Sequence, residues 1–413
     1  MRALLINTLY PTPGEPKIVG GAEIFVRALA EGLAAAGDEV EVVRAAHRAE
    51  PHDETQNGVV VRSAPVDNIY APFAAARPNA LKRLVWHALD DWRRDAAHVA
   101  RRIEAFRPDV VHTHTLTGLT TGVWDAAAVR GVPVVHTLHD YYLTCPRSIR
   151  FRNGRSCARS CVDCRLLTTR RRRACETPSA VIGVSRRILD IHQELGLFRH
   201  TAMTAVIRHA VERIDAPPLR PRLAGAAARP LALGYIGRVT QEKGVENLAR
   251  AIALLPPGSV TLALAGRAED SAKRRLKALA PEADLRFLGF VRPLDFYRQV
   301  DVVAAPSIWE EPAGLVIAEA QAAGRPVLST RYGGVPEGVR DGVAGWLTNG
   351  EPEDLAARLK SLIDDPSQIL RAARACEAAR GERGFGAVVD EHRSLYARVA
   401  GHALAPVPAA AAG

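Results

Sequence analysis

Residues 301–330 read DVVAAPSIWEEPAGLVIAEAQAAGRPVLST. Two short apolar runs, DVVAAP and RPVLST, stand on either side of a polar loop and a longer apolar segment, and such short runs are typical of buried parallel strands. The segment LVIAEAQAAG predicts a helix that begins near Gly314 and stops at Gly324. The stretch therefore predicts a strand, a crossover helix and a second parallel strand.

The same alternation runs through most of the chain. Before residue 211, the runs ALLIN, EVEVV, DVVHTH, VPVVHTL and AVIGVS are separated by helical patterns such as 21–36 and 81–106. From residue 231 it restarts with LALGYIG, TLALAG and LRFLGF. The pattern predicts an α/β protein with two doubly wound, Rossmann-like parallel sheets facing a central cleft.

Length supports two domains, because 413 residues exceed what one hydrophobic core usually serves. The segment DAPPLRPRLAGAAARP is rich in Pro and Ala and lacks apolar periodicity, which indicates a linker. We expect an N-terminal domain with a Cys- and Arg-rich insertion, a linker, a second domain, a C-terminal helix and a disordered tail. Their predicted ranges are 1–214 (insertion 145–175), 215–230, 231–385, 386–402 and 403–413.

Composition describes an ordinary soluble chain, with 47% hydrophobic and 24% charged residues. No apolar run reaches the ~18 residues that a membrane-spanning helix needs. The apolar stretch before Asn7 and Pro11 is too short for a signal peptide. We therefore expect a cytoplasmic protein.

The positive charge lies mainly in the N-terminal half. Residues 1–215 hold 30 Lys and Arg against 23 Asp and Glu, and residues 145–175 hold ten Arg against the single acidic residue Asp163. This density fits a surface facing phosphate or anionic lipid, and it equally fits a solvated basic loop.

Two glutamates surround the start of the predicted helix at 314–324. Glu311 lies on the preceding loop and Glu319 lies more than one turn into the helix. The free backbone N–H groups of Gly314 and Leu315 form an anion site between them. Because carboxylates accept hydrogen bonds from pairs of sugar hydroxyls, the layout fits a ligand built as sugar, phosphate, sugar. A nucleotide sugar has this layout, although two glutamates alone are more often surface residues.

A second strand-to-helix loop carries two cations. In GYIGRVTQEKG, the strand ends at Gly237, Arg238 follows, and Lys243 stands five residues later. Cations on such a loop supply what a diphosphate leaving group requires as its negative charge grows. Each residue alone fits a solvated loop, so the prediction rests on both loops together.

These residues resemble glycosyltransferase family 4, whose members are retaining, nucleotide-sugar-dependent transferases of the GT-B fold. The resemblance covers nearly the whole chain, through GGAEIFVRALAEGLAAAGDEVEVV, DVVHTH, VVHTLHDYYLTCP, IGVSRRI, GRVTQEKGVENLARAI, EEPAGLVIAEAQAAGRPVLST and GGVPEGV. It implies that Arg238 and Lys243 bind the donor diphosphate, that Gly237, Gly314 and Leu315 belong to the donor site, that Glu311 holds the transferred sugar, and that Glu319 holds the ribose.

In the N-terminal domain, the resemblance implies that Gly20 and Gly21 form a loop allowing close approach to the backbone, and that His139 lies near the transferred sugar. His112 and His114 are expected to be structural. The implied mechanism needs no metal and no protein general base, because a phosphate oxygen of the leaving group takes the acceptor proton. One departure is VIRHAVE, where His209 replaces the family's usual Asn.

The cysteines raise a separate question. Cys145, Cys157, Cys161 and Cys164 lie within twenty residues, and cytoplasmic chains seldom keep disulfides. We predict a structural zinc ion at these four residues, the alternative being free thiols that pack an insertion. A zinc module that binds nucleic acid is disfavoured, because only Cys161 and Cys164 have ligand-like spacing.

The sequence thus predicts an enzyme that moves a hexose-type sugar from a UDP- or GDP-sugar to a glycan or other hydroxyl acceptor. A nucleotide-sugar epimerase of the same fold is the nearer alternative. We expect a lipid-linked acceptor and peripheral docking on the anionic inner membrane face. The supporting pattern lies in 81–106, which mixes Leu84, Val85, Trp86, Leu89 and Trp92 with Lys82, Arg83, Arg93 and Arg94, as an interfacial helix would. If the tryptophans instead face the core, this pattern no longer supports docking on a membrane.

Overall fold

The structure, a computed structural model, divides the chain into two compact units. It describes residues 1–12, 20–46, 53–66, 68–72, 78–93, 96–219, 229–380 and 384–404. The first unit comprises Met1–Arg150, Ala158–Arg208 and the described part of 386–413, and the second comprises Phe151–Cys157 and His209–Phe385. The second unit therefore begins at His209, earlier than the predicted linker.

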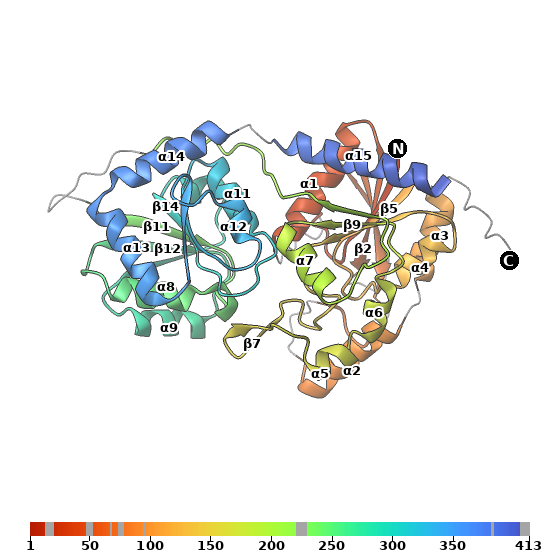
Figure 1. Ribbon diagram of the computed structural model, residues 1–413, viewed down its shortest axis with the longest axis horizontal. Helices are drawn as coiled ribbons and strands as arrows, with labels where there is room; N and C mark the ends of the chain where they lie inside the picture. Colours follow the sequence, from red (N-terminus) through yellow and green to blue (C-terminus); the bar gives the residue numbers. More distant parts are fainter. Residues whose placement is uncertain are drawn as a thin grey trace. The chain divides into compact units, whose positions relative to one another are not determined.

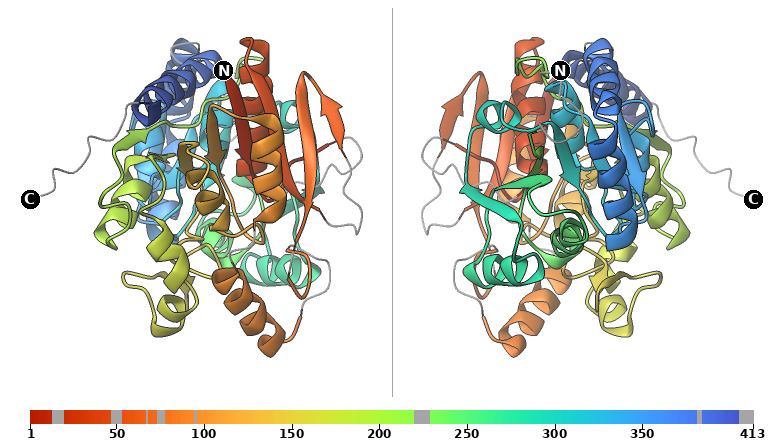
Figure 2. Two further views of the ribbon diagram at one scale, coloured as in Figure 1. Left: turned by 90° about the vertical axis from the view of Figure 1, so that its right-hand side faces the viewer. Right: turned by 90° about the vertical axis from the view of Figure 1, so that its left-hand side faces the viewer.

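The first unit is built on an eight-stranded sheet in the order β10-β9-β6-β5-β1-β2-β4-β3. Every pair of neighbours is parallel except β3 and β4, which are antiparallel at one edge (orange in Figure 2). The strands are β1 (Arg2–Ile6), β2 (Glu39–Ala46), β3 (Glu54–Gln56), β4 (Val59–Pro65), β5 (Val110–Thr113), β6 (Val134–Leu138), β9 (Ala180–Gly183) and β10 (Met203–Val206).

Eight helices of the described residues accompany this sheet. They are α1 (Gly21–Ala35), α2 (Ala80–Trp92), α3 (Ala97–Phe106), α4 (Gly122–Ala128), α5 (Val162–Leu166), α6 (Thr169–Ala174), α7 (Arg186–Glu194) and α15 (Phe385–Leu404). The last of these comes from the far end of the chain and lies against the first unit (Figure 1). Its Tyr396 hydroxyl is hydrogen-bonded to His112 of β5, and its Arg393 forms an ion pair with Asp38.

The second unit has a six-stranded parallel sheet in the order β13-β12-β11-β14-β15-β16. Its strands are β11 (Leu231–Ile236), β12 (Val260–Ala265), β13 (Asp284–Gly289), β14 (Val302–Ala305), β15 (Val327–Thr330) and β16 (Gly345–Thr348). This is the Rossmann order, in which the direction of winding reverses between β11 and β14. Ligands of such sheets bind beyond the carboxyl ends of the strands at that point.

Helices pack on the second sheet over two hydrophobic clusters. One cluster contains Leu248 and Leu359 and the other contains Phe296 and Ile317. The helices are η1 (Gln241–Lys243, a 3-10 turn), α8 (Val245–Ala253), α9 (Asp270–Leu279), α10 (Pro293–Tyr297), α11 (Leu315–Ala322), α12 (Val335–Gly338), α13 (Pro352–Asp364) and α14 (Ser367–Ala379). The doubly wound α/β architecture predicted for each half is confirmed.

Several predicted boundaries differ from the structure. The pattern at 81–106 forms two helices, α2 and α3, with Arg93 already in extended backbone. Part of the predicted linker packs in the second unit, because Arg325 donates to the Pro217 carbonyl at 2.9 Å. Ile214, just before the predicted linker, also packs there, with its N–H donating to the Ala322 carbonyl. The rest of the linker at 220–228, and the tail beyond 404, lie outside the described residues.

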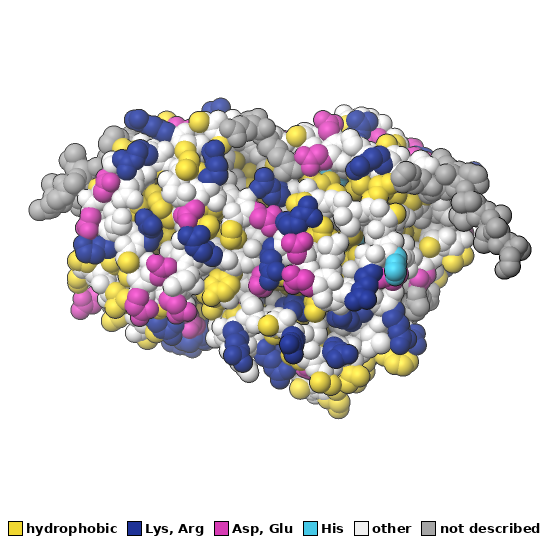
Figure 3. Space-filling view, viewed as in Figure 1, with side chains coloured by type: hydrophobic (Ala, Val, Ile, Leu, Met, Phe, Trp, Pro, Cys, Tyr) yellow, Lys and Arg dark blue, Asp and Glu magenta, His cyan; other side chains and the backbone are white. Residues whose placement is uncertain are grey.

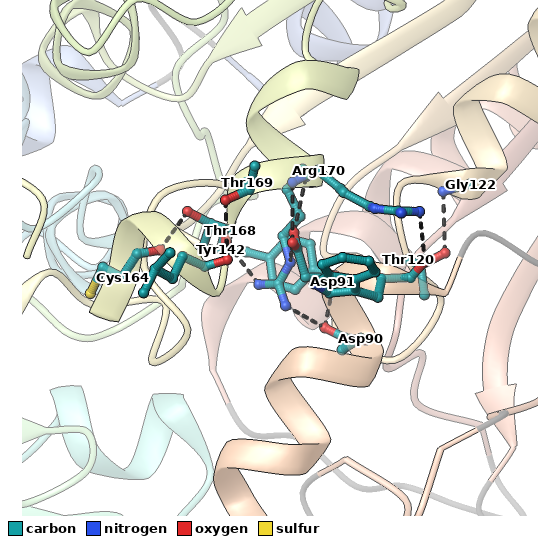
Figure 4. Close-up of polar contacts among 12 residues, drawn as sticks. Asp90, Asp91, Thr120, Gly122, Tyr142, Cys164, Thr168, Thr169 and Arg170 are labelled. Atoms are coloured by element: carbon teal, nitrogen blue, oxygen red, sulfur yellow. Dashed lines mark hydrogen bonds and ion pairs between the residues drawn. The ribbon is translucent and has the colours of Figure 1, made fainter. Parts of the chain in front are cut away.

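The Arg-rich insertion is partly ordered by a buried ion network (Figure 4). Arg171 is fully buried, pairs with Asp90 at 2.9 Å and lies over the Tyr142 ring. Asp91 accepts the N–H groups of Arg170 and Arg171 at the start of α6. The run at 170–173 is therefore not simply a solvated loop or a binding surface. Its Arg171 is a buried residue that attaches α6 to the end of α2.

Part of the same insertion belongs to the second unit. Strands β7 (Phe151–Arg152) and β8 (Arg155–Ser156) form a short antiparallel hairpin. The Ser156 hydroxyl accepts the backbone N–H of Glu310 at 3.0 Å. This hairpin therefore supports the loop that carries the two adjacent glutamates.

Candidate active site

The site of the second unit lies on the loops that follow β11 and β14, the two strands at the reversal of strand order. Lys243 ends the 3-10 turn after β11, and Glu311 lies on the loop after β14. Their side chains form an ion pair, with the Lys243 ammonium 2.6 and 2.9 Å from the two carboxylate oxygens of Glu311. The topology therefore brings together two residues that are 68 positions apart.

Glu311 is buried and surrounded by donors. Its Oε2 accepts hydrogen bonds from Ser307 at 2.9 Å and from the Trp309 indole N–H at 2.8 Å, in addition to Lys243. Burial by itself would raise the pKa of Glu311, but the charge and hydrogen bond of Lys243, with those of Ser307 and Trp309, outweigh it and lower the pKa. The carboxylate is thus ionised at neutral pH and held in one orientation.

Backbone packing holds the two loops close to each other. The Ile308 N–H donates to the Glu242 carbonyl at 2.9 Å. Gly244 has φ +69°, and a Cβ there would lie 1.8 Å from the Pro306 carbonyl oxygen. Gly333 also approaches the backbone of Glu311 closely, and a Cβ at Gly333 would lie 2.2 Å from the Glu311 carbonyl oxygen. These contacts require glycine and fix the geometry of the Lys243–Glu311 pair.

Arg238 differs from Lys243 in having an exposed guanidinium. Among the described residues it makes no ion pair, while its carbonyl accepts the Tyr235 hydroxyl. Gly237 precedes it at the end of β11 and donates its N–H to Ala265. The Arg238 charge is therefore available to an anion at the mouth of the strand-to-helix loop.

The predicted helix start is confirmed at Leu315, with Gly314 as N-cap in the left-handed region. The N–H groups of Gly314 and Leu315 have no acceptor within the helix, and they follow Glu311 by three and four residues. Glu319 lies on the same helix, where it accepts the Tyr297 hydroxyl at 3.2 Å. Burial raises the pKa of Glu319, and only the Tyr297 hydrogen bond opposes this. The two glutamates thus have different environments.

In the first unit, Gly20 and Gly21 form the start of α1. The Gly20 N–H donates to Glu23 at 2.8 Å, which caps the helix. The loop at 13–19 that precedes it lies outside the described residues. His139 follows β6, and its ring lies 5.5 Å from that of Phe25 in α1. The structure therefore places the predicted histidine beside the glycine-led helix.

His112 and His114, which the sequence predicts to be structural, lie close to His139: His114 contacts it and His112 lies beside His114. The His114 Nδ1 lies 3.0 Å from His139 Nε2, and His112 is fully buried between Thr137 and Tyr396. Burial, together with neighbouring histidines, lowers the pKa of His112 and of His114 well below the usual value, so both rings are neutral. A neutral His114 orients His139.

Asp140, next to His139, was not singled out from the sequence. It is half-buried, and burial raises the pKa of its carboxyl to about 7, although the Tyr142 N–H opposes the shift. The sequence pattern could not identify Asp140, because its raised pKa depends on how deeply the folded loop buries the carboxyl. Ser307 and Trp309 were also missed, although both stand in the SIWEE stretch at spacings that place them near Glu311.

The four cysteines predicted to bind zinc are distributed over both units. Cys145, Cys161 and Cys164 belong to the first unit, whereas Cys157 belongs to the second. None of the six cysteines, all of which are described, forms a disulfide.

Two family models match the two halves of the chain. A family model described as "Glycosyltransferase Family 4" matches residues 19–212, and one described as "Glycosyl transferases group 1" matches residues 230–365. A "42.6 kDa protein in cps region" of Klebsiella pneumoniae is 32% identical over 82% of this chain and 87% of its own length. A D-inositol 3-phosphate glycosyltransferase of Xylanimonas cellulosilytica is 32% identical, with 92% of each chain covered.

Solved structures show the same fold. Anabaena Alr3699/HepE in complex with UDP-glucose superposes with a TM-score of 0.68 at 22% identity, covering 96% of this chain and 99% of that one. This likeness shows two Rossmann-like sheets of the GT-B kind. Because both halves match glycosyltransferase models and two relatives are 32% identical over most of the chain, the protein is a GT-B glycosyltransferase that belongs to glycosyltransferase family 4.

Proposed function

We propose that the protein transfers a hexose-type sugar from a UDP- or GDP-sugar to a hydroxyl acceptor, with retention of the anomeric configuration. The observation that carries the proposal is the Lys243–Glu311 pair at the strand-order reversal, beside the start of α11. It combines a cation for a diphosphate with a fixed carboxylate for sugar hydroxyls.

The hydrogen bonds of Glu311 leave room for a sugar. Its Oε2 accepts from Lys243, Ser307 and Trp309, whereas among the described residues only Lys243 donates to Oε1 in the hydrogen bonds found. A carboxylate oxygen has about two lone-pair sites, so Oε1 has one for a sugar hydroxyl. Ser307 and Trp309, which donate to Oε2, would keep the carboxylate in place during the reaction.

The leaving diphosphate would be held by Arg238, by the third N–H of Lys243 and by the N–H groups of Gly314 and Leu315. As the bond from the anomeric carbon to the phosphate oxygen breaks, the acceptor oxygen bonds to the same face of that carbon. The leaving phosphate oxygen takes the acceptor proton, so charge balances without a protein base. Glu319 would hold the ribose. The family resemblance assigns close approach of the acceptor to Gly20 and Gly21, and contact with the transferred sugar to His139.

The names of similar proteins agree with these substrates. The Anabaena structure holds UDP-glucose, which has the sugar, diphosphate and nucleoside layout that the site fits. The Xylanimonas relative is described as acting on inositol 3-phosphate, and the Klebsiella relative is assigned to the cps region. A glycan acceptor and a small polyol phosphate are both hydroxyl acceptors, and we propose the glycan because of the surface described below.

The test is a panel of UDP- and GDP-sugars, first by thermal shift and then by sugar incorporation into acceptor, with the anomeric configuration of the product read by NMR. We expect stabilisation by one donor and a product of the same configuration. An inverted product would refute retention. An altered sugar without an acceptor product would identify an epimerase instead.

The first unit carries an exposed apolar surface with basic neighbours, which we call the α2–α5 surface. It consists of Leu81 (69% exposed), Leu84, Val85 and Trp92 of α2, with Val162 (75%) and Leu166 of α5. Figure 3 shows apolar and basic side chains gathered along the lower edge, where Figure 1 places α2 and α5. Lys82, Arg83 and Arg165 are exposed there as well.

This surface differs from the predicted interfacial helix, because Trp86 is buried, Leu89 is half-buried and Arg94 lies outside the described residues. Trp86 is buried and donates to the Tyr70 carbonyl at 2.8 Å, so it belongs to the core, while Trp92 is 60% exposed. Within the described ranges no helix is long and apolar enough to cross a bilayer. We propose that the α2–α5 surface docks on an anionic membrane, where each basic side chain contributes about 1 kcal/mol, and that the acceptor is lipid-linked.

Sedimentation with anionic liposomes tests the docking. We expect co-sedimentation at low salt and release at high salt, and loss of binding in Leu84→Glu with Val162→Glu. Leu254→Glu, at an exposed leucine of the second unit, is the matched control and should bind normally. Equal recovery of the wild-type protein with and without liposomes would refute a membrane-presented acceptor.

A further inference from the structure

The β7–β8 hairpin contacts the loop that carries Glu311. The hairpin lies in the segment Phe151–Cys157, which belongs to the second unit although the chain on either side of it belongs to the first. The Ser156 hydroxyl accepts a hydrogen bond from the backbone N–H of Glu310 at 3.0 Å, across 154 positions of sequence. A segment that is only part of a Cys- and Arg-rich insertion in the sequence thus contacts the residue directly before Glu311.

The turn of the hairpin lies beside the other loop of the site. A Cβ at Gly154 would lie 3.6 Å from the side-chain nitrogen of Gln241, which is ordinary van der Waals contact. Gln241 begins the 3-10 turn that ends at Lys243. One hairpin therefore lies against both loops that carry the Lys243–Glu311 pair.

The hairpin has a turn that favours its own conformation. Asn153 and Gly154 connect the paired strands, and their φ values of +52° and +76° lie in the left-handed region, as a type I′ turn requires. Asn-Gly is the sequence most typical of this turn, whose twist matches that of the flanking strands. Phe151, in the first strand, is buried. The hairpin is therefore a defined support for the loop rather than a segment shaped by it.

The hydrogen bond from Glu310 differs from those that hold the Glu311 carboxylate. Ser307 and Trp309 donate to that carboxylate, but they lie on the same loop and would move with it. Ser156 attaches the peptide before Glu311 to a separate element. Without the Ser156 hydroxyl, the Glu310 N–H would lose an acceptor and this peptide could rotate. The direction of the Glu311 side chain therefore depends on the hairpin.

We propose that Ser156 is a positioning residue for sugar transfer and that it acts through Glu311. The inference rests on the proposed function, in which a carboxylate oxygen of Glu311 binds a hydroxyl of the transferred sugar. A displacement of about 1 Å at a reacting centre can reduce a rate by about 100-fold, so a fixed peptide before Glu311 supports the step that breaks the sugar–phosphate bond. The nucleotide contacts proposed for Arg238 and Glu319 do not involve this peptide.

Steady-state kinetics of two Ser156 variants tests the proposal. We expect Ser156→Ala to lower kcat about 10-fold and to change the donor KM by less than about twofold, because the lost hydrogen bond orients the sugar and not the nucleotide. Ser156→Thr keeps the hydroxyl in a residue that strands favour, and it should stay within about twofold of the wild type. Ser160→Ala, in the same insertion and 3.4 Å from the Arg150 guanidinium, is the matched control and should keep wild-type kinetics.

Nucleotide binding separates positioning from a general structural effect. UDP and GDP lack the sugar that Glu311 would hold. Whichever of the two stabilises the wild type in a thermal-shift assay should therefore stabilise Ser156→Ala equally. A lost nucleotide shift in Ser156→Ala would mean that the hairpin supports the whole site, and it would overturn the positioning role.

A double variant tests whether Ser156 acts through Glu311. In the Glu311→Ala background, Ser156→Ala should reduce the residual transfer by less than about twofold, because positioning has no effect once the carboxylate is gone. A further loss of about 10-fold in that background, or a Ser156→Ala single variant within about twofold of the wild type, would overturn this inference alone. Absence of sugar transfer in the wild type would overturn the proposed function, and the inference with it.

Discussion

Glu311 illustrates how a buried carboxylate can be kept ionised and still be available. A carboxylate in a protein interior loses hydration, which favours its neutral form. Here one cation and two neutral donors replace the lost water, and they do so mainly through one of its two oxygens. The other oxygen keeps the acceptor capacity that a sugar hydroxyl requires.

We predict that Lys243→Ala and Glu311→Ala each reduce transfer by at least ~100-fold, because each removes a charged contact from an enclosed site. The fold should persist, since neither residue is part of the hydrophobic clusters. Steady-state kinetics with the preferred donor measures the effect, and circular dichroism checks the fold.

Lys273→Ala serves as the control for removal of a lysine from the second unit, because its ion pair with Asp270 lies on the surface of α9. It should leave turnover unchanged. Near-normal turnover in Lys243→Ala would show that the diphosphate binds elsewhere.

Asp140 should make stability depend on pH. Its carboxyl has an ordinary pKa of 3.8 that burial, with smaller effects of Cys145 and Glu23, raises to about 7 in the folded protein. A group with a raised pKa contributes stability fully below its ordinary value and loses it as the pH rises through the folded value. We predict that Asp140→Asn removes part of the decline in unfolding free energy between pH 4 and pH 7. Urea unfolding across that range measures it, and parallel curves for wild type and variant would contradict the prediction.

Helix α2 is amphipathic in an unusual sense. Its exposed face carries Leu81, Leu84 and Val85, while its buried end carries Asp90 and Asp91. The two aspartates are buried where Asp90 pairs with Arg171 and Asp91 caps α6. The buried polar network therefore attaches the C-terminal end of α2 to the start of α6.

We predict that Asp90→Ala lowers the free energy of unfolding by about 3–5 kcal/mol, because Arg171 would keep only the Asp91 carboxylate, at 3.6 Å. The matched control is Asp270→Ala, which removes an exposed aspartate and should change stability little. Urea denaturation followed by fluorescence measures both. A loss in Asp90→Ala no larger than that of the control would mean that Arg171 finds water or another partner.

The sequence predicted the strands and helices that have a clear local pattern. The runs at β1, β2, β5, β6, β9 and β11 to β15 are β-branched or apolar and were found, and the helix start at Leu315 was found from Gly314. Strands β4, β10 and β16 were missed: MTAV and GWLT are only four residues long, and VVVRSAP, although it begins with three valines, was not singled out. Asp90 and Asp91 were missed as interior residues because their burial depends on Arg171, 80 positions away.

For the whole enzyme, we predict that brief exposure to EDTA leaves transfer unchanged. The proposed leaving-group cations are Arg238 and Lys243, which a chelator cannot remove, and a thiolate-bound zinc ion would not touch the substrate. An initial-rate assay with and without EDTA measures this. A complete loss that added Mg²⁺ restores would show that a metal ion binds the diphosphate.

Helix α15 also has a consequence for how the protein is made. From Gly386 on it belongs to the first unit, where it buries Val388, His392 and Tyr396, yet this part is translated after every residue of the second. A ribosome releases the chain from its N-terminus, and domains generally fold as their residues emerge. We therefore expect the second unit to fold first. The first unit cannot complete its fold until α15 is translated, and until then β5 and its histidines remain uncovered. A chain truncated after residue 385 should therefore contain a folded second unit and a first unit that chaperones still recognise.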